Sequence, residues 1–160
     1  HPEISAPDAW DKDFLKKKLD EMRALGITPI PKLNFSCGHH TWLKQYNRMV
    51  SSPIYYQVCA DLIKEVCELF DNPPLFHLGF DEINEMGFCE LCKGTPIAEL
   101  FADAVNHFYG VVKALGKEVM IWDDMIEQVP SLLTDLPKDM RVSLLSYTLF
   151  CQIQDPKTDR

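Results

Sequence analysis

The sequence has little positive charge and no long hydrophobic run, and both absences exclude classes of partner. Its 16 Lys and Arg residues are outnumbered by 24 Asp and Glu residues, which gives a formal net charge of −8 at pH 7. Nucleic acids and anionic membrane surfaces attract basic proteins, so we expect neither as a partner. No apolar stretch approaches the ~20 residues that a membrane-spanning helix needs, so we expect no membrane association.

Internal repeats and low-complexity segments are also absent, and what remains is an ordinary globular composition. Hydrophobic residues make up 46% of the 160 residues, which is enough for one core, so we expect residues 1–160 to form a single domain. The 6 cysteines do not indicate a compartment. Cys59 and Cys67 lie within a helical pattern, where buried free thiols are common, so we expect mostly reduced thiols.

Helical and strand-like patterns alternate along the chain. The predicted helices cover residues 11–26, 53–70 and 95–116, with a short or broken helix over 126–137. The predicted strands cover residues 27–35, 75–81, 117–125 and 141–150. Such alternation indicates parallel strands with covering helices, in a doubly wound sheet or a barrel. A closed barrel needs eight strands, so we expect an α/β fold that is a partial (β/α)8 TIM barrel, with about four parallel strands.

Polar side chains gather near the ends of three successive predicted strands. In strand 75–81, His77 and Asp81 share one face, and the apolar residues between them share the other. Asn34 holds a similar place in the preceding strand, and Trp122 and Asp124 do so in the following one. Active sites of parallel α/β proteins lie at these carboxyl ends. Strand-end acids can also cap the next helix, but three polar strand ends together favour a functional site.

The segment FHLGFDE, residues 76–82, resembles the H-x-G-G-D-E motif of glycoside hydrolase family 20, the β-N-acetylhexosaminidases. The preceding strand in that family ends in a P-E-I-D-x-P-G-H type sequence, and PKLNFSCGH stands in its place here. The family's next strand carries a pocket tryptophan, which Trp122 matches. The similarity extends from about Ile27 to Tyr147 and implies the central part of a glycoside hydrolase catalytic barrel.

The resemblance implies an activity, the hydrolysis of terminal β-linked N-acetylhexosamine, and roles for two acids. Glu82 would be the general acid that protonates the leaving oxygen, and Asp81 would hold the substrate's 2-acetamido group. The acetamido oxygen attacks the anomeric carbon in this substrate-assisted retaining mechanism, so the acids can be neighbours in sequence. We expect Asp81 and an apolar wall from Trp122 to raise the pKa of Glu82. No metal or other cofactor is implied.

The resemblance also implies supporting roles around the sugar for six residues: His77, Trp122, His39, Asn34, Asp124 and Tyr147. The match to the family's loop histidine is shifted by one residue, so His40 is an alternative to His39. His77 is equally well explained as a buried histidine satisfied by a backbone carbonyl, and Trp122 as an ordinary core aromatic.

The sequence departs from the family's pattern at several positions. Lys32 and Asn34 replace two acids, and Phe80 replaces the second glycine of the motif. The family's substrate-binding arginine from the first strand has no counterpart. Three alternatives therefore stay open: a non-catalytic carbohydrate-binding relative, a member of another hexosaminidase-like barrel family, and a metal-dependent hydrolase.

Cys89 and Cys92 form a single C-x-x-C motif in the loop after the acid pair. The motif is compatible with zinc, if Cys37 and a loop histidine complete the site, with a disulfide, or with two unrelated thiols. The expected partner is a carbohydrate substrate. Because four strands leave open sheet edges, we also expect self-association or dependence on further barrel segments.

Overall fold

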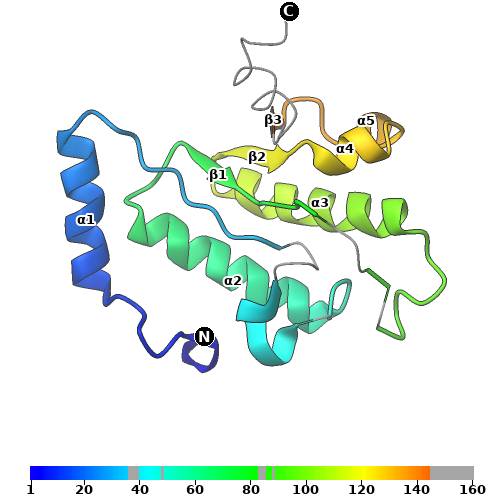
Figure 1. Cartoon of the computed structure of the whole chain (residues 1–160), viewed down its shortest axis with the longest axis horizontal. Coiled ribbons are helices and arrows are strands. Elements are labelled where there is room, and N and C mark those ends of the chain that lie inside the picture. Colours follow the sequence, from blue (N-terminus) through cyan, green and yellow to red (C-terminus); the bar gives the residue numbers. More distant parts are fainter. Residues whose placement is uncertain (36–39, 48, 83–85, 88, 145–160) are drawn as a thin grey trace, which may run out of the picture.

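The computed structural model describes residues 1–35, 40–47, 49–82, 86–87 and 89–144. Its centre is a three-stranded parallel sheet in the order β1-β2-β3, formed by Leu75–His77, Glu118–Trp122 and Arg141–Ser143 (Figure 1). In the register, Phe76 pairs with Val119, and Ile121 pairs with Val142. The predicted α/β class with parallel strands is confirmed.

The predicted strand over residues 27–35 is present only as a short bridged segment beside β1. Lys32 forms an isolated parallel bridge with His77. The Leu33 amide donates to the His77 carbonyl at 3.2 Å, and the His77 amide donates to the Pro31 carbonyl at 2.9 Å. A proline cannot donate to a ladder, so Pro29 and Pro31 shorten the strand and leave it at the edge of the sheet. The parallel order of four segments nevertheless follows the prediction.

Helices account for most of the remaining described residues: η1 (Pro2–Ile4), α1 (Lys12–Ala24), η2 (His40–Tyr46), α2 (Pro53–Leu69), α3 (Ile97–Ala114), α4 (Asp124–Gln128) and α5 (Leu132–Asp135). Local capping explains where the long helices begin. The Asp11 side chain accepts a hydrogen bond from the Phe14 amide at the start of α1, and Ser52 does the same for Tyr55 at the start of α2. The broken helix predicted over residues 126–137 corresponds to α4 and α5.

The core lies between the sheet and the two longest helices. Figure 1 shows α2 and α3 running together beneath the strands, with α1 against α2 at the left. Large side chains fill this layer: Phe35, Tyr55, Phe76, Phe80, Phe101 and Phe108. In β2, Val119 and Ile121 are buried toward the helices, while Met120 and Trp122 alternate onto the other face and are only half-buried. The second face therefore carries the side chains that the site uses.

The strands themselves are shorter than predicted. β1 ends at His77 rather than Asp81, because Gly79 and Phe80 both have positive φ angles, of 76° and 65°, which no strand accommodates. β3 is described over Arg141–Ser143, and residues 145–150 of the predicted strand lie outside the described part of the chain. Among the helices that the structure describes, none is long and apolar enough to cross a membrane.

Candidate active site

The candidate site begins with a hydrogen bond between residues 47 positions apart, Asn34 and Asp81. The Asn34 side-chain amide donates to Asp81 Oδ1 at 2.6 Å, and its oxygen accepts from the Phe80 amide at 3.3 Å. Asp81 is buried, with 9% of its surface exposed. Asn34 therefore fixes the Asp81 carboxylate just beyond the carboxyl end of β1.

A sharp turn after β1 makes this contact possible. A Cβ atom on Gly79 would lie 2.5 Å from Asn34 Oδ1 and 2.9 Å from Asn34 Cα, so only glycine fits there. Phe80 and Glu82 also adopt left-handed conformations, with φ of 65° and 52°. Such strain costs of order 1–3 kcal/mol per residue and concentrates at functional sites.

The turn sends the side chains of Phe80 and Asp81 in different directions. It directs Phe80 into the core, where its ring lies 5.5 Å from that of Phe101. It directs Asp81 toward Asn34. The departure from the family motif at Phe80 is therefore accommodated by packing under α3 and does not enter the site.

Asp124 holds the backbone of Glu82. The Glu82 amide donates to Asp124 Oδ2 at 2.6 Å, while the Glu82 side chain is exposed. Asp124 Oδ1 is buried and has no hydrogen-bond partner in the described part of the chain. Burial raises the pKa of Asp124. The hydrogen bond from the Glu82 amide lowers this pKa, and the nearby Asp81 charge raises it. Asp124 thus positions the second acid of the pair.

The expected surroundings of Glu82 differ from what the structure shows. Sequence reasoning predicted an apolar wall from Trp122 around this carboxyl group. The Glu82 side chain is exposed, so the residues that the structure describes do not bury it. A buried environment for this group would have to come from residues outside the part of the chain that the structure describes.

His77 supports the turn rather than either carboxylate directly. Its ring Nδ1 accepts a hydrogen bond from the Gly79 amide at 2.9 Å, so the neutral ring carries its proton on Nε2. Burial lowers the pKa of His77 to about 4, the Lys32 charge lowers it further, and Asp81 opposes both. The sequence also allowed a buried histidine that bonds to a backbone carbonyl. In the structure the partner of the ring is a backbone amide instead. Nε2 is buried without a hydrogen-bond partner among the described residues.

Lys32 is a site residue that sequence reasoning missed. Its ammonium lies 3.9 Å from Asp81 Oδ1 and 5.2 Å above the ring centroid of Trp122. The Trp122 ring in turn lies 4.6 Å from that of His77. The signal was available, because Lys32 shares a strand face with Asn34. The lysine that replaces a family acid is therefore an exposed cation beside Asp81.

Other predicted site residues cannot be compared with the structure. His39 and Tyr147 lie outside the described residues, as does the side chain of His40. Cys37, which a zinc site would need, also lies outside them. Within the described ranges, no group of three or more His, Cys, Asp or Glu side chains could hold a metal ion.

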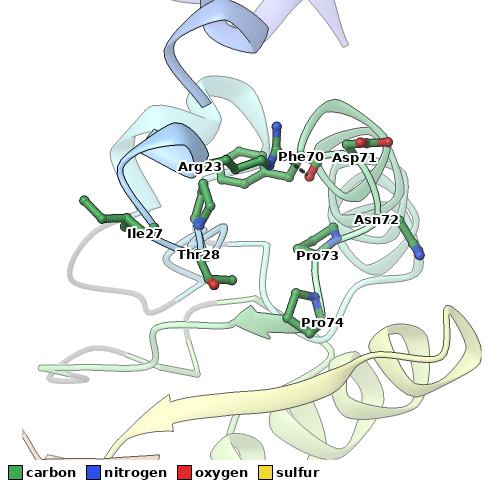
Figure 2. A pocket seen from close by; sticks show the side chains of 10 residues that line it. Arg23, Ile27, Thr28, Phe70, Asp71, Asn72, Pro73 and Pro74 are labelled. Carbon is green, nitrogen blue, oxygen red and sulfur yellow. Dashed lines mark hydrogen bonds between the residues drawn. The ribbon is translucent and has the colours of Figure 1, made fainter. Parts of the chain in front are cut away.

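A separate hollow lies at the opposite ends of the strands (Figure 2). Pro73 and Pro74, just before β1, line it together with Phe70. Figure 2 shows Arg23 bridging it, through a hydrogen bond from its guanidinium to the Phe70 carbonyl at 2.7 Å. Active sites of parallel α/β proteins lie at the other, carboxyl ends of the strands, so the hollow is separate from the candidate active site.

Comparisons with known proteins show the family and the fold of the chain. The chain matches the family described as "Glycosyl hydrolase family 20, catalytic domain" over residues 17–145. Among solved structures, it is similar to the chitobiase of Flavobacterium johnsoniae, with a TM-score of 0.66 and 20% sequence identity. The match covers 88% of this chain but only 25% of the chitobiase chain, and it shows the fold alone. No curated protein matches the sequence. Because the family match spans most of its length, the chain belongs to glycoside hydrolase family 20.

Proposed function

We propose that this chain is the central part of a β-N-acetylhexosaminidase barrel that hydrolyses terminal β-linked N-acetylhexosamine. The observation that carries the proposal is the carboxylate of Asp81, held by Asn34 at 2.6 Å beside an exposed Glu82 at the end of β1. The membership of family 20 supports the substrate class. The reaction requires no metal or other cofactor.

Asp81 and Glu82 divide the chemistry between them. Asp81 accepts a hydrogen bond from the acetamido N–H of the substrate, and its negative charge makes the acetamido oxygen more nucleophilic. That oxygen forms a bond to the anomeric carbon as the glycosidic bond breaks, and Glu82 donates its proton to the leaving oxygen. Glu82 then takes a proton from the water that opens the oxazolinium ion, which regenerates the acid.

The neighbouring residues hold this pair in place. Asn34 fixes Asp81, Asp124 fixes the Glu82 backbone, and His77 holds the amide of Gly79 in the turn between them. Trp122 supplies an aromatic wall next to Lys32. Positioning of this kind contributes to catalysis because misplacement of a reacting group by about 1 Å costs on the order of 10²-fold in rate. His39 and Tyr147 keep the sugar-binding roles that the family resemblance implies.

A carbohydrate-binding relative without catalysis is the second candidate. The observation that favours it is Lys32, whose ammonium lies 3.9 Å from Asp81 Oδ1 and competes with the acetamido N–H for that carboxylate. We also propose that residues 1–160 form one domain and that further strands complete a (β/α)8 barrel around the sugar.

The first test is a pair of aryl β-glycosides that differ only in the 2-acetamido group. We expect cleavage of the acetamido sugar alone, and a loss of about 10²–10⁴-fold in Glu82→Gln, as for removal of a general acid. Glu68→Gln, a matched change at an exposed position of α2, should leave the rate unchanged. Equal cleavage of both sugars contradicts the proposal. Sugar binding without cleavage, unchanged in Glu82→Gln, would establish the binding alternative.

Asp81 and Glu82 should respond differently to the leaving group. Glu82→Gln should lose most activity on aryl glycosides of weakly acidic phenols, because these leave only when protonated. Asp81→Ala should lose activity by about the same factor, of order 10²-fold or more, on every acetamido substrate, because the acetamido attack is needed for each. Kinetics across a series of phenols measure both. A loss in Asp81→Ala that varies with phenol acidity would remove the residue from its assigned role.

A further inference from the structure

Two thiols in the loop between β1 and α3 converge on one backbone carbonyl. Cys89 Sγ lies 3.2 Å from the Val50 carbonyl oxygen, and Cys92 Sγ lies 3.8 Å from the same atom. Cys92 Sγ also lies 3.3 Å from the Cys89 carbonyl oxygen. Neither thiol contributes to the proposed glycosidase chemistry, and both are reduced in the structure.

The backbone between them has the geometry that a disulfide needs. The Cys92 amide donates to the Cys89 carbonyl at 3.1 Å, which closes a four-residue turn. The end Cα atoms of such a turn are less than about 7 Å apart. Disulfides span Cα separations of about 4.4–6.8 Å, so the two sulfur atoms can bond with little backbone movement.

The two thiols differ in access to solvent. Cys92 is 2% exposed, and burial raises its pKa, whereas Cys89 is half-buried. An incoming reagent therefore meets Cys89 first. The remaining described cysteines, Cys59 and Cys67, are buried in α2 and eight residues apart, which is ~12 Å along a helix, so they cannot pair.

We propose that Cys89 and Cys92 are a modification site that low-molecular-weight disulfides, such as glutathione disulfide, oxidise reversibly to an intramolecular disulfide. The Cys89 thiolate attacks one glutathione sulfur, and a glutathione thiolate leaves. Cys92 then gives up its proton, its sulfur attacks Cys89 Sγ, and the second glutathione leaves. Two protein thiols are oxidised, one glutathione disulfide is reduced to two glutathione molecules, and the two protons pass to these products.

Oxidation changes how this loop is held against the rest of the molecule. The Cys89 S–H that donates to the Val50 carbonyl is removed, and so is the Cys92 S–H, which lies between the Cys89 and Val50 carbonyl oxygens. The Val50 oxygen then loses its thiol contacts with the loop. Val50 lies between η2 and α2, two residues before the Ser52 cap of α2. The start of α2 should therefore exchange its amide hydrogens faster in the oxidised protein than in the reduced one.

The experiment is titration of the purified chain with glutathione disulfide, followed by peptide mapping in a mass spectrometer. The wild type should form a Cys89–Cys92 disulfide that a thiol reductant reverses. Cys92→Ser should stop at a stable glutathione adduct on Cys89. Cys89→Ser should react at least tenfold more slowly at Cys92. Both variants should fold, because the serine hydroxyl keeps a donor for the Val50 carbonyl.

Several results would overturn the proposal. One is a mapped bond from Cys89 to a cysteine other than Cys92, and another is an adduct on wild-type Cys89 that Cys92 never resolves. Equal reactivity of Cys92 with and without Cys89 would contradict the proposed order, in which Cys89 reacts first. Oxidation without any change in amide exchange at the start of α2 would contradict the assigned role of the Val50 contacts.

Discussion

At the scale of single residues, hydrogen bonds and nearby charges hold the polar side chains of the site. His77 is 6% exposed, accepts from the Gly79 amide and faces the Lys32 charge, so it stays neutral in the folded protein. Asp81 accepts a hydrogen bond from Asn34 and lies 3.9 Å from the Lys32 ammonium. The same small region therefore holds a neutral histidine beside a hydrogen-bonded carboxylate.

The neutral state of His77 makes stability depend on pH. Its pKa is about 4 in the folded protein against 6.5 for the unperturbed side chain. The unfolded chain therefore binds a proton below pH 6.5 that the folded chain accepts only near pH 4, so stability falls as pH is lowered through this window. The loss is of order 3 kcal/mol. It should be largely absent in His77→Gln.

Urea unfolding at pH 7.5 and at a pH just above 4 measures this difference. Carboxylates titrate in both proteins, so the comparison between wild type and His77→Gln isolates the histidine. His107→Gln is the comparison variant. Partial burial alone lowers the pKa of His107 on α3, so its loss should change the pH dependence less than the loss of His77. Equal pH dependence in wild type and His77→Gln would show that His77 titrates normally.

At the scale of secondary-structure elements, the important feature is the left-handed turn that ends β1. The sequence correctly predicted a strand that delivers Asp81, but the strand ends four residues earlier, at His77. Alternation of side chains along a strand cannot describe Gly79 and Phe80, whose φ angles of 76° and 65° redirect the chain. The predicted faces were still correct for Phe80 and Asp81, because the turn and the strand pattern happen to separate them in the same way.

The close approach of Asn34 at this turn predicts the cost of one substitution. Gly79→Ala would strain a φ of +76° and place Cβ 2.5 Å from Asn34 Oδ1. Gly116→Ala is the matched control, because its φ is +72° and its new Cβ would meet nothing within 4 Å. Left-handed strain alone costs about 1 kcal/mol, so Gly79→Ala should destabilise by at least ~2 kcal/mol more than the control. Urea denaturation midpoints test this, and equal effects would mean that Asn34 does not pack against Gly79.

At the scale of the whole molecule, the feature that matters is the pair of edges of the parallel sheet that the structure describes. The described sheet has three strands and one bridged segment, with β3 at one edge. Apolar side chains near these edges are exposed: Ile30 at 45%, Val142 at 44% and Leu144 at 76%. Unpaired edges with apolar side chains bind further strands, from the same protein or from a second copy.

We therefore expect the isolated chain to self-associate as its concentration rises. Val142→Lys should weaken this association, because a charge on an edge strand opposes pairing. Leu25→Lys is the matched control, since Leu25 is 78% exposed at the end of α1 and away from the sheet. Sedimentation velocity across a concentration series measures the association. A monodisperse wild-type monomer, or equal effects of the two substitutions, would contradict this expectation.

The sequence by itself determined the features that depend on local pattern. Helical periodicity placed α1, α2 and α3, alternation of helices and strands predicted parallel pairing, and the motif at residues 76–82 singled out the acids. The tertiary structure alone decided that Asn34 binds Asp81, that Asp124 holds the Glu82 amide, and that Lys32 joins the site. These contacts join residues more than 40 positions apart or depend on left-handed backbone angles. Strand register sets the long-range contacts, and turn geometry sets the left-handed angles. The periodicity of a single segment carries no information on register or on turn geometry.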